Sequence, residues 1–127
     1  MNQLFDYHLE HKVGDRQIVA VVCAGGMTSS MLTQRMQKHF DELNMPYYAM
    51  YASIQALIDP DFHALYLDKL AMVFTSPQVA HYHDQAKAAM KSIPVEKIEP
   101  RVFGTMDYQK VVSIVQEVLE SPSIKTA

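Results

Sequence analysis

The sequence is poor in cysteine and contains no long apolar run. Its 127 residues include one cysteine, which excludes an internal disulfide framework and a cysteine-rich zinc site and favours a reducing compartment. Every apolar stretch falls well short of the roughly 18 residues that a membrane span requires. The N-terminus lacks the basic start and apolar centre of a signal peptide. We therefore expect a cytoplasmic protein without direct membrane insertion.

Positive charge is also scarce. Lysine and arginine number 11 against 14 aspartates and glutamates, giving a net charge of −3 at pH 7, and neither sign forms a long block. A nucleic-acid binder needs clustered basic side chains to contact phosphates, so we expect no nucleic-acid partner. The length and the hydrophobic share of 49% fit one ordinary globular domain.

The chain alternates between strand-like and helix-like segments. Short apolar or β-branched runs predict strands over 17–22, 47–52, 70–74 and 94–98. Helical spacing and capping residues predict helices over 29–43, 54–58, 62–69 and 77–90 and a last helix opened by Asp107. This alternation predicts an α/β fold: a single domain with a four-stranded parallel sheet, doubly wound, with helices on both faces. We expect residues 17–122 to form the domain, after a lead-in over 1–16 and before a tail over 123–127.

One loop carries the strongest chemical signal. Between the first strand and the first helix lie Cys23, Ala24, Gly25, Gly26, Met27, Thr28, Ser29 and Ser30. Two glycines let the backbone curl closely, and the hydroxyls and free N–H groups of a helix start suit an anion such as phosphate. The positive end of the helix favours a nucleophilic thiolate at the loop's mouth. The spacing therefore predicts a phosphate-handling cysteine, without metal or cofactor.

Two chemistries use a cysteine in such a loop. Cysteine phosphatases place an arginine six residues after the cysteine to clamp the phosphoryl group, but Ser29 stands there. They also need an acid for the leaving group, and Asp59-Pro60 favours a helix-breaking turn over that role. The remaining chemistry is a phosphoryl relay.

At this point the sequence resembles a known family. The loop Cys23-x-x-Gly26-Met27-Thr28-Ser29-Ser30 is similar to the Cys-x-x-Gly-Met-Ser-Thr-Ser loop of the IIB components of phosphotransferase-system (PTS) sugar transporters, lactose/cellobiose class. Residues 72–80, 93–98 and 103–118 resemble the family's Gly-Pro-Gln strand end, last strand and closing helix. The resemblance covers about 17–120. It departs from the family at Ala24-Gly25, at the order of the hydroxyls and at Ser76, where glycine is usual.

The resemblance implies a protein-phosphocysteine–sugar phosphotransferase with a flavodoxin-like, phosphotyrosine-phosphatase-I-like fold. Cys23 would accept phosphate from a phosphohistidine on the IIA protein or domain. It would pass the phosphate to a sugar, a disaccharide of the cellobiose or lactose type, bound by the membrane IIC permease. Residues 24–30 would hold the phosphoryl group, and we expect Pro77 and Gln78 to border the site.

Other interpretations stay open at this stage. A cysteine-based phosphatase or arsenate-reductase-like enzyme could use a similar loop, and a flavodoxin-like binding module could keep Cys23 as a structural residue.

The six histidines show no ligand-like spacing, and we expect all of them at the surface. Ser76-Pro77 predicts a helix N-cap followed by the first helical residue.

Overall fold

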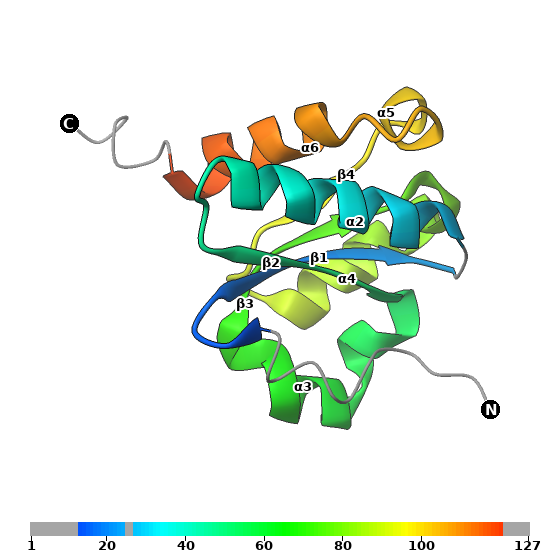
Figure 1. The fold of residues 1–127 in the computed structure, drawn as a ribbon. Coiled ribbons are helices and arrows are strands. Elements are labelled where there is room, and N and C mark those ends of the chain that lie inside the picture. Colours follow the sequence, from blue (N-terminus) through cyan, green and yellow to red (C-terminus); the bar gives the residue numbers. More distant parts are fainter. Residues whose placement is uncertain (1–12, 25–26, 121–127) are drawn as a thin grey trace.

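A computed structural model describes residues 13–24 and 27–120 of the chain. Its strands form one parallel sheet in the order β2-β1-β3-β4 (Figure 1). The strands are β1 (Gln17–Cys23), β2 (Tyr47–Ser53), β3 (Leu70–Thr75) and β4 (Val95–Lys97). The predicted doubly wound, four-stranded parallel sheet is therefore confirmed, and the short β4 lies at an edge, where its charged residues fit.

The central strand β1 explains why the sheet is covered on both sides. Its Val19 and Val21 face one side, its Ile18 and Val22 face the other, and all four side chains are fully buried. A β-branched run without alternating polar residues is typical of a strand with two apolar faces. The sheet therefore needs a helical layer on each face.

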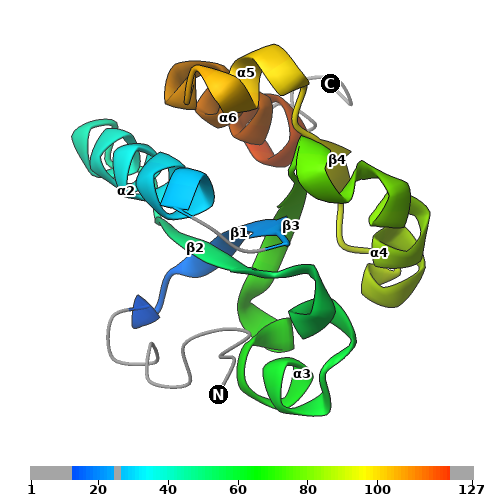
Figure 2. The same cartoon turned by 90° about the vertical axis from the view of Figure 1, so that its right-hand side faces the viewer.

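Helices form one layer on each face of the sheet (Figure 2). Each layer packs on the sheet around its own hydrophobic core. The α2 face of the sheet is covered by α2 (Met27–Glu42), α5 (Pro100–Gly104) and α6 (Tyr108–Val115), with η4 (Gln116–Glu120) continuing α6. The α4 face is covered by η1 (Ile54–Ile58), α3 (Pro60–Tyr66), η2 (Leu67–Lys69) and α4 (His83–Met90). In the described part of the chain, no helix is long and apolar enough to cross a membrane.

The structure differs from the sequence prediction at several element boundaries. Helix α2 starts at Met27, two residues earlier than expected, and ends before Asn44, which adopts a left-handed conformation with φ 56°. The segment over 100–106, to which the sequence pattern assigned no element, contains the short helix α5. The residues from Val13 to Arg16 belong to the predicted lead-in, yet Val13 is fully buried on the α4 face. Residues 1–12 of the lead-in, residues 121–122 of the predicted domain and the whole predicted tail lie outside the described residues.

The helix predicted from Pro77 is irregular at its start. Residues Pro77–Tyr82 form the 3₁₀ segment η3, in which Val79 has non-helical angles of φ −120° and ψ 23°, and α4 begins only at His83. Helical spacing predicts an inward stripe of Val79, Tyr82, Ala86 and Met90. Tyr82 is 40% exposed, so the prediction is wrong for this residue. The kink changes the residue spacing, and the buried positions become Val79, His83, Ala86 and Met90.

Candidate functional site

The candidate site lies at the carboxyl edge of the sheet, where β1 ends in Cys23. Strand β1 pairs with β2 on one side, with Cys23 opposite Ser53, and with β3 on the other, with Val22 opposite Thr75. The chain leaves β1 towards β2 and later returns to β3 on the opposite side. Such a change of direction between neighbouring parallel strands is where ligands bind in doubly wound folds. Cys23 stands at this point, and its side chain is 2% exposed.

The predicted phosphate loop connects this edge to α2. Ala24 is exposed, Gly25 and Gly26 lie outside the described residues, and Met27 opens the helix. The first turn of α2 contains no acidic residue. Its unpaired N–H groups and the positive end of its dipole therefore face no carboxylate of the same turn, a condition that favours binding of an anion.

The hydroxyl of Ser29, a residue of the predicted loop, is buried. Ser29 precedes Leu32 by three residues and shares the inward stripe of α2 with Leu32, Met36 and Phe40, so its side chain faces the sheet and is 1% exposed. Its Oγ has no hydrogen-bond partner. Ser30 is half-buried, and Thr33 Oγ1 donates to the carbonyl oxygens of Ser29 and Ser30 at 3.0 and 2.9 Å.

The end of β3 brings a second buried hydroxyl to the same edge. Ser76 is fully buried, and its N–H donates to the carbonyl oxygen of Val22 at 3.0 Å, which extends the β1–β3 ladder by one residue. The prediction of Ser76 as an N-cap and of Pro77 as the first helical residue is confirmed, but the Ser76 hydroxyl makes no capping hydrogen bond. Val79 N–H instead bonds to the Ser76 carbonyl oxygen at 3.1 Å, and Ser76 Oγ has no partner.

Pro77 and Gln78, which we expected to border the site, follow Ser76 directly. They form the start of η3, beyond the carboxyl end of β3. Pro77 is half-buried and Gln78 is exposed. Their backbone is thus at the same edge of the sheet as Cys23, and Gln78 presents a polar side chain to solvent there.

The side chain of Thr75, the residue before Ser76, makes its hydrogen bonds on the α4 face of the sheet. Its Oγ1 lies 2.9 Å from Nδ1 of His83 and donates to the carbonyl oxygen of Glu96 at 3.4 Å. His83 is only 8% exposed, so the prediction that all six histidines lie at the surface is wrong for this residue. The spacing of His83, Ala86 and Met90 is the helical signal that could have identified it. Burial, and then the charges of Lys97 and Lys87, lower the pKa of His83 below its ordinary value.

Asp59, the residue considered as the acid of a phosphatase, caps a helix in this fold. Asp59 Oδ1 accepts hydrogen bonds from the N–H groups of Asp61 and Phe62, at 2.8 and 3.3 Å, and caps α3. The preferred interpretation of Asp59-Pro60 as a helix boundary is therefore confirmed. Among residues 13–24 and 27–120, no group of three or more His, Cys, Asp or Glu side chains could hold a metal ion.

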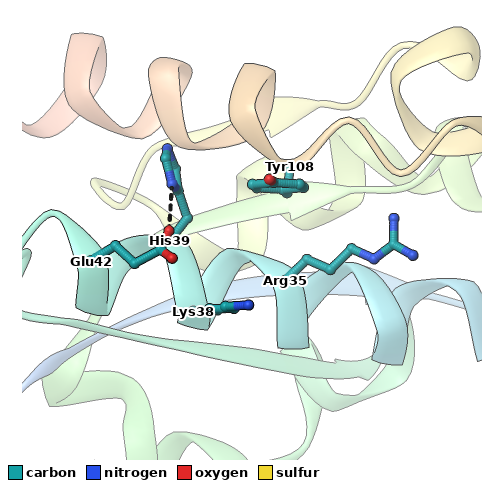
Figure 3. A pocket seen from close by; sticks show the side chains of 5 residues that line it. All are labelled: Arg35, Lys38, His39, Glu42 and Tyr108. Carbon is teal, nitrogen blue, oxygen red and sulfur yellow. Dashed lines mark ion pairs between the residues drawn. The ribbon is translucent and has the colours of Figure 1, made fainter.

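A polar groove between α2 and α6 was not predicted from the sequence (Figure 3). It has a volume of about 350 Å³ and is lined by Arg35, Lys38, His39, Glu42 and Tyr108. His39 pairs with Glu42 at 3.5 Å and packs edge-on against Tyr108, with ring centroids 5.4 Å apart. In the described residues, the buried side-chain polar atoms without a partner are those of Ser29 and Ser76, neither of which lines this groove. The carboxyl edge is therefore the better candidate site.

Comparison with known proteins gives the same family. A sequence model described as "PTS system, Lactose/Cellobiose specific IIB subunit" matches residues 18–113. The PTS galactose-specific EIIB component of Lactococcus lactis subsp. cremoris is 29% identical over 105 residues, covering 81% of this chain and 96% of that protein. The PTS cellobiose-specific EIIB component of Lactococcus lactis subsp. lactis is 28% identical over 105 residues, with the same two coverages.

A longer relative and two solved structures are also similar to this chain. The PTS lactose-specific EIICB component of Streptococcus mutans is 30% identical over 86 residues, covering 68% of this chain and 14% of that protein. The lactose-specific IIB domain of Streptococcus pneumoniae has a similar fold, with a TM-score of 0.68, 18% identity, and coverage of 84% of this chain and 100% of that one. The cellobiose-specific IIB protein of Borrelia burgdorferi gives a TM-score of 0.58 at 25% identity, over 79% of this chain and 88% of that one. The chain therefore belongs to the lactose/cellobiose-specific IIB subunit family of the phosphoenolpyruvate:carbohydrate phosphotransferase system.

Proposed function

We propose that Cys23 carries a phosphoryl group between a phosphohistidine of a IIA protein or domain and a sugar bound by a membrane IIC permease. The sugar is a disaccharide of the cellobiose or lactose type, and the chain works in the cytoplasm. The observation that carries the proposal is the position of Cys23: it ends β1 at the switch point of the sheet, next to a helix start without acidic residues. A fused IIC and IIB arrangement in the Streptococcus mutans relative, an EIICB component, supports a IIC partner.

In the first step, the Cys23 sulfur attacks the phosphorus of the phosphohistidine in line with the leaving nitrogen. The S–P bond forms while the P–N bond breaks, and the electron pair of the P–N bond returns to the imidazole nitrogen. That nitrogen takes up a proton, which balances the proton lost from the thiol. The products are phosphocysteine and neutral histidine.

In the second step, a sugar hydroxyl oxygen attacks the same phosphorus. The O–P bond forms, the S–P bond breaks, and its electron pair returns to sulfur. The proton lost by the hydroxyl balances the proton that restores the thiol. The sugar leaves as its phosphate ester, and Cys23 is ready for another cycle.

The chain assists both steps by positioning and by electrostatic stabilisation, without metal or arginine. The backbone N–H groups of residues 24–30 would receive the equatorial oxygens of the transferring group: Ala24, Gly25, Gly26, Met27, Thr28, Ser29 and Ser30. The hydroxyl of Ser29 faces the sheet and is free to donate as well. Pro77 and Gln78 would border the site and contact a docked partner or sugar.

Incubation with a phosphorylated IIA protein of the lactose/cellobiose class tests this function. We expect intact-mass measurement to show one added phosphoryl group, which disappears when a matching IIC and its sugar are supplied. A phosphatase would instead hydrolyse aryl phosphates continuously and lose the label in buffer alone. Failure of every IIA partner to label the chain, or steady hydrolysis of aryl phosphate, would contradict the relay.

A further inference from the structure

We infer that Ser76 is a phosphate-binding residue of the Cys23 site, with its hydroxyl donating a hydrogen bond to an oxygen of the phosphoryl group. The inference rests on the proposed function, since it assigns a further residue to the same site. Ser76 directly follows β3 and lies outside the loop over 23–30. It would therefore hold the phosphoryl group from the side opposite to α2.

The sheet register places Ser76 beside Cys23. Val22 pairs with Thr75, and the hydrogen bond from Ser76 N–H to the Val22 carbonyl oxygen continues the ladder by one residue. Neighbouring positions of parallel strands direct their side chains to the same face, and successive residues alternate. Val22 belongs to the core of the α4 face, and Thr75 bonds to His83 on that face. Cys23 and Ser76 therefore both turn to the α2 face.

The hydroxyl of Ser76 has no role within the chain. Its residue is fully buried, its Oγ has no hydrogen-bond partner, and it does not cap η3 although it stands at the N-cap position. A buried hydroxyl without a partner is unfavourable for folding, so the fold gains nothing from this group over an alanine. A bound ligand would give the hydroxyl the partner that the chain does not supply.

A second hydroxyl faces the same space from another element. Ser29 Oγ is also buried and without a partner, and it faces the sheet from the first turn of α2. Cys23, Ser29 and Ser76 thus lie at the same edge of the sheet, at the end of β1, in the first turn of α2 and directly after β3. Neutral donors beside the positive end of a helix suit a tetrahedral oxyanion such as a phosphoryl group, and the first turn of α2 offers no carboxylate to a metal cation.

Inorganic phosphate is a probe that requires no partner protein. Phosphate bound at the site should protect Cys23 from iodoacetamide, and the concentration for half-protection measures its affinity. We expect Ser76→Ala to raise that concentration by about tenfold, since a hydrogen bond to a charged group is removed. Ser113→Ala is the matched control, because Ser113 lies on α6 towards the amino edge of the sheet, where Gln116 contacts Met45. This control should match the wild type.

Thermal unfolding separates a ligand-binding role from a structural one. Without phosphate, Ser76→Ala should unfold at the same temperature as the wild type or higher, and phosphate should stabilise it less. A lower unfolding temperature combined with unchanged phosphate protection would overturn the inference, because it would show that the hydroxyl serves the fold alone.

The labelled protein keeps this inference separate from the proposed function. If a IIA protein labels the wild type and Ser76→Ala equally, and both keep the label and bind phosphate equally, Ser76 is not a ligand although the relay stands. If no IIA labels the wild type but Ser76→Ala weakens phosphate protection, the relay fails and the phosphate-binding role of Ser76 stands. We expect loss of the phosphoryl group to be several-fold faster, or loading to be several-fold lower, in Ser76→Ala.

Discussion

Thr75 and Ser76 are consecutive residues with buried hydroxyls, yet they are in different chemical situations. Thr75 is 1% exposed and Ser76 is fully buried. The hydroxyl of Thr75 turns to the α4 face and bonds to His83 and to the Glu96 carbonyl. The hydroxyl of Ser76 turns to the α2 face and has no partner. Thr75 on the α4 face is satisfied within the chain, whereas Ser29 and Ser76 keep hydroxyls without a partner at the edge of the sheet where Cys23 ends β1.

This difference suggests a division of roles across one sheet edge. Polar groups that bond within the chain contribute to its stability, and their loss should lower the free energy of unfolding without affecting chemistry. Polar groups that are buried without a partner contribute little or nothing to stability, and their loss should affect ligand binding alone. Variants on the two faces therefore test this division of roles.

Cys23→Ser should have the largest effect, because it removes the nucleophile. A serine hydroxyl is far less ionised than a thiol at neutral pH, so phosphoryl transfer to the sugar should fall to background. The side chains are similar in size, and the circular dichroism spectrum and unfolding temperature should match the wild type. Retained sugar phosphorylation would show that another residue accepts the phosphoryl group.

Thr75→Val should mainly affect stability. The substitution keeps the shape of the side chain and removes the bonds to His83 and Glu96, leaving buried groups without partners. We expect the free energy of unfolding to fall by about 1–3 kcal/mol. Urea titration measures this loss, and the rate of phosphoryl transfer serves as the control, which should stay unchanged. An unchanged midpoint together with slower transfer would reverse the assignment of the two faces.

Ser29→Ala should affect binding without affecting stability. The hydroxyl of Ser29 has no partner in the chain, and alanine is a better helix former, so the unfolding temperature should stay the same or rise. Half-protection of Cys23 by inorganic phosphate should require about tenfold more phosphate than in the wild type. A loss of stability with unchanged phosphate protection would place Ser29 with Thr75 among the structural groups.

The smallest expected effect is a pH dependence from the α4 face. Burial first, and then Lys97 and Lys87, lower the pKa of His83, while Asp84 and Glu96 act in the opposite direction. Because the folded pKa lies below the unfolded one, the unfolded chain binds the proton first as the pH falls. The stability from a neutral His83 is therefore fully present above about pH 6.5 and declines as the pH falls below that value.

Urea titrations at several pH values would measure this contribution. His83→Asn can keep a hydrogen-bonding group near Thr75 without titrating, so the decline in acid should be shallower than in the wild type. An identical pH dependence in the two proteins would mean that other groups cause the acid destabilisation.

Much of the fold could be predicted from local patterns. The β-branched run of β1, the inward stripe of α2 and the stop at Asn44 depend on neighbours in sequence, and the structure agrees with them. The loop over 23–30 could be identified as a candidate site for the same reason, since strand end, glycines, hydroxyls and helix start are contiguous.

The rest depends on contacts between distant segments. The placement of Ser76 beside the end of β1 follows from the register of β3 on β1, which no local pattern in the sequence gives. Burial of His83 follows from the kink at Val79, which changes the helical spacing that the sequence suggested. The groove along α2 exists because Tyr108 of α6 packs against His39. The register and the groove could be found only after the elements were placed together, whereas the spacing of His83, Ala86 and Met90 is a local sign of the His83 burial.

Phosphorus-31 NMR of the chain after labelling by a phosphorylated IIA protein would test most directly whether Cys23 carries the phosphoryl group. Phosphorus bonded to sulfur resonates apart from phosphorus bonded to nitrogen or oxygen. We predict a single phosphothiolate resonance in the wild type, which is absent in Cys23→Ser and disappears when IIC and sugar are added. A phosphoramidate or phosphoester resonance in the wild type, or a signal that persists in Cys23→Ser, would contradict a relay through Cys23.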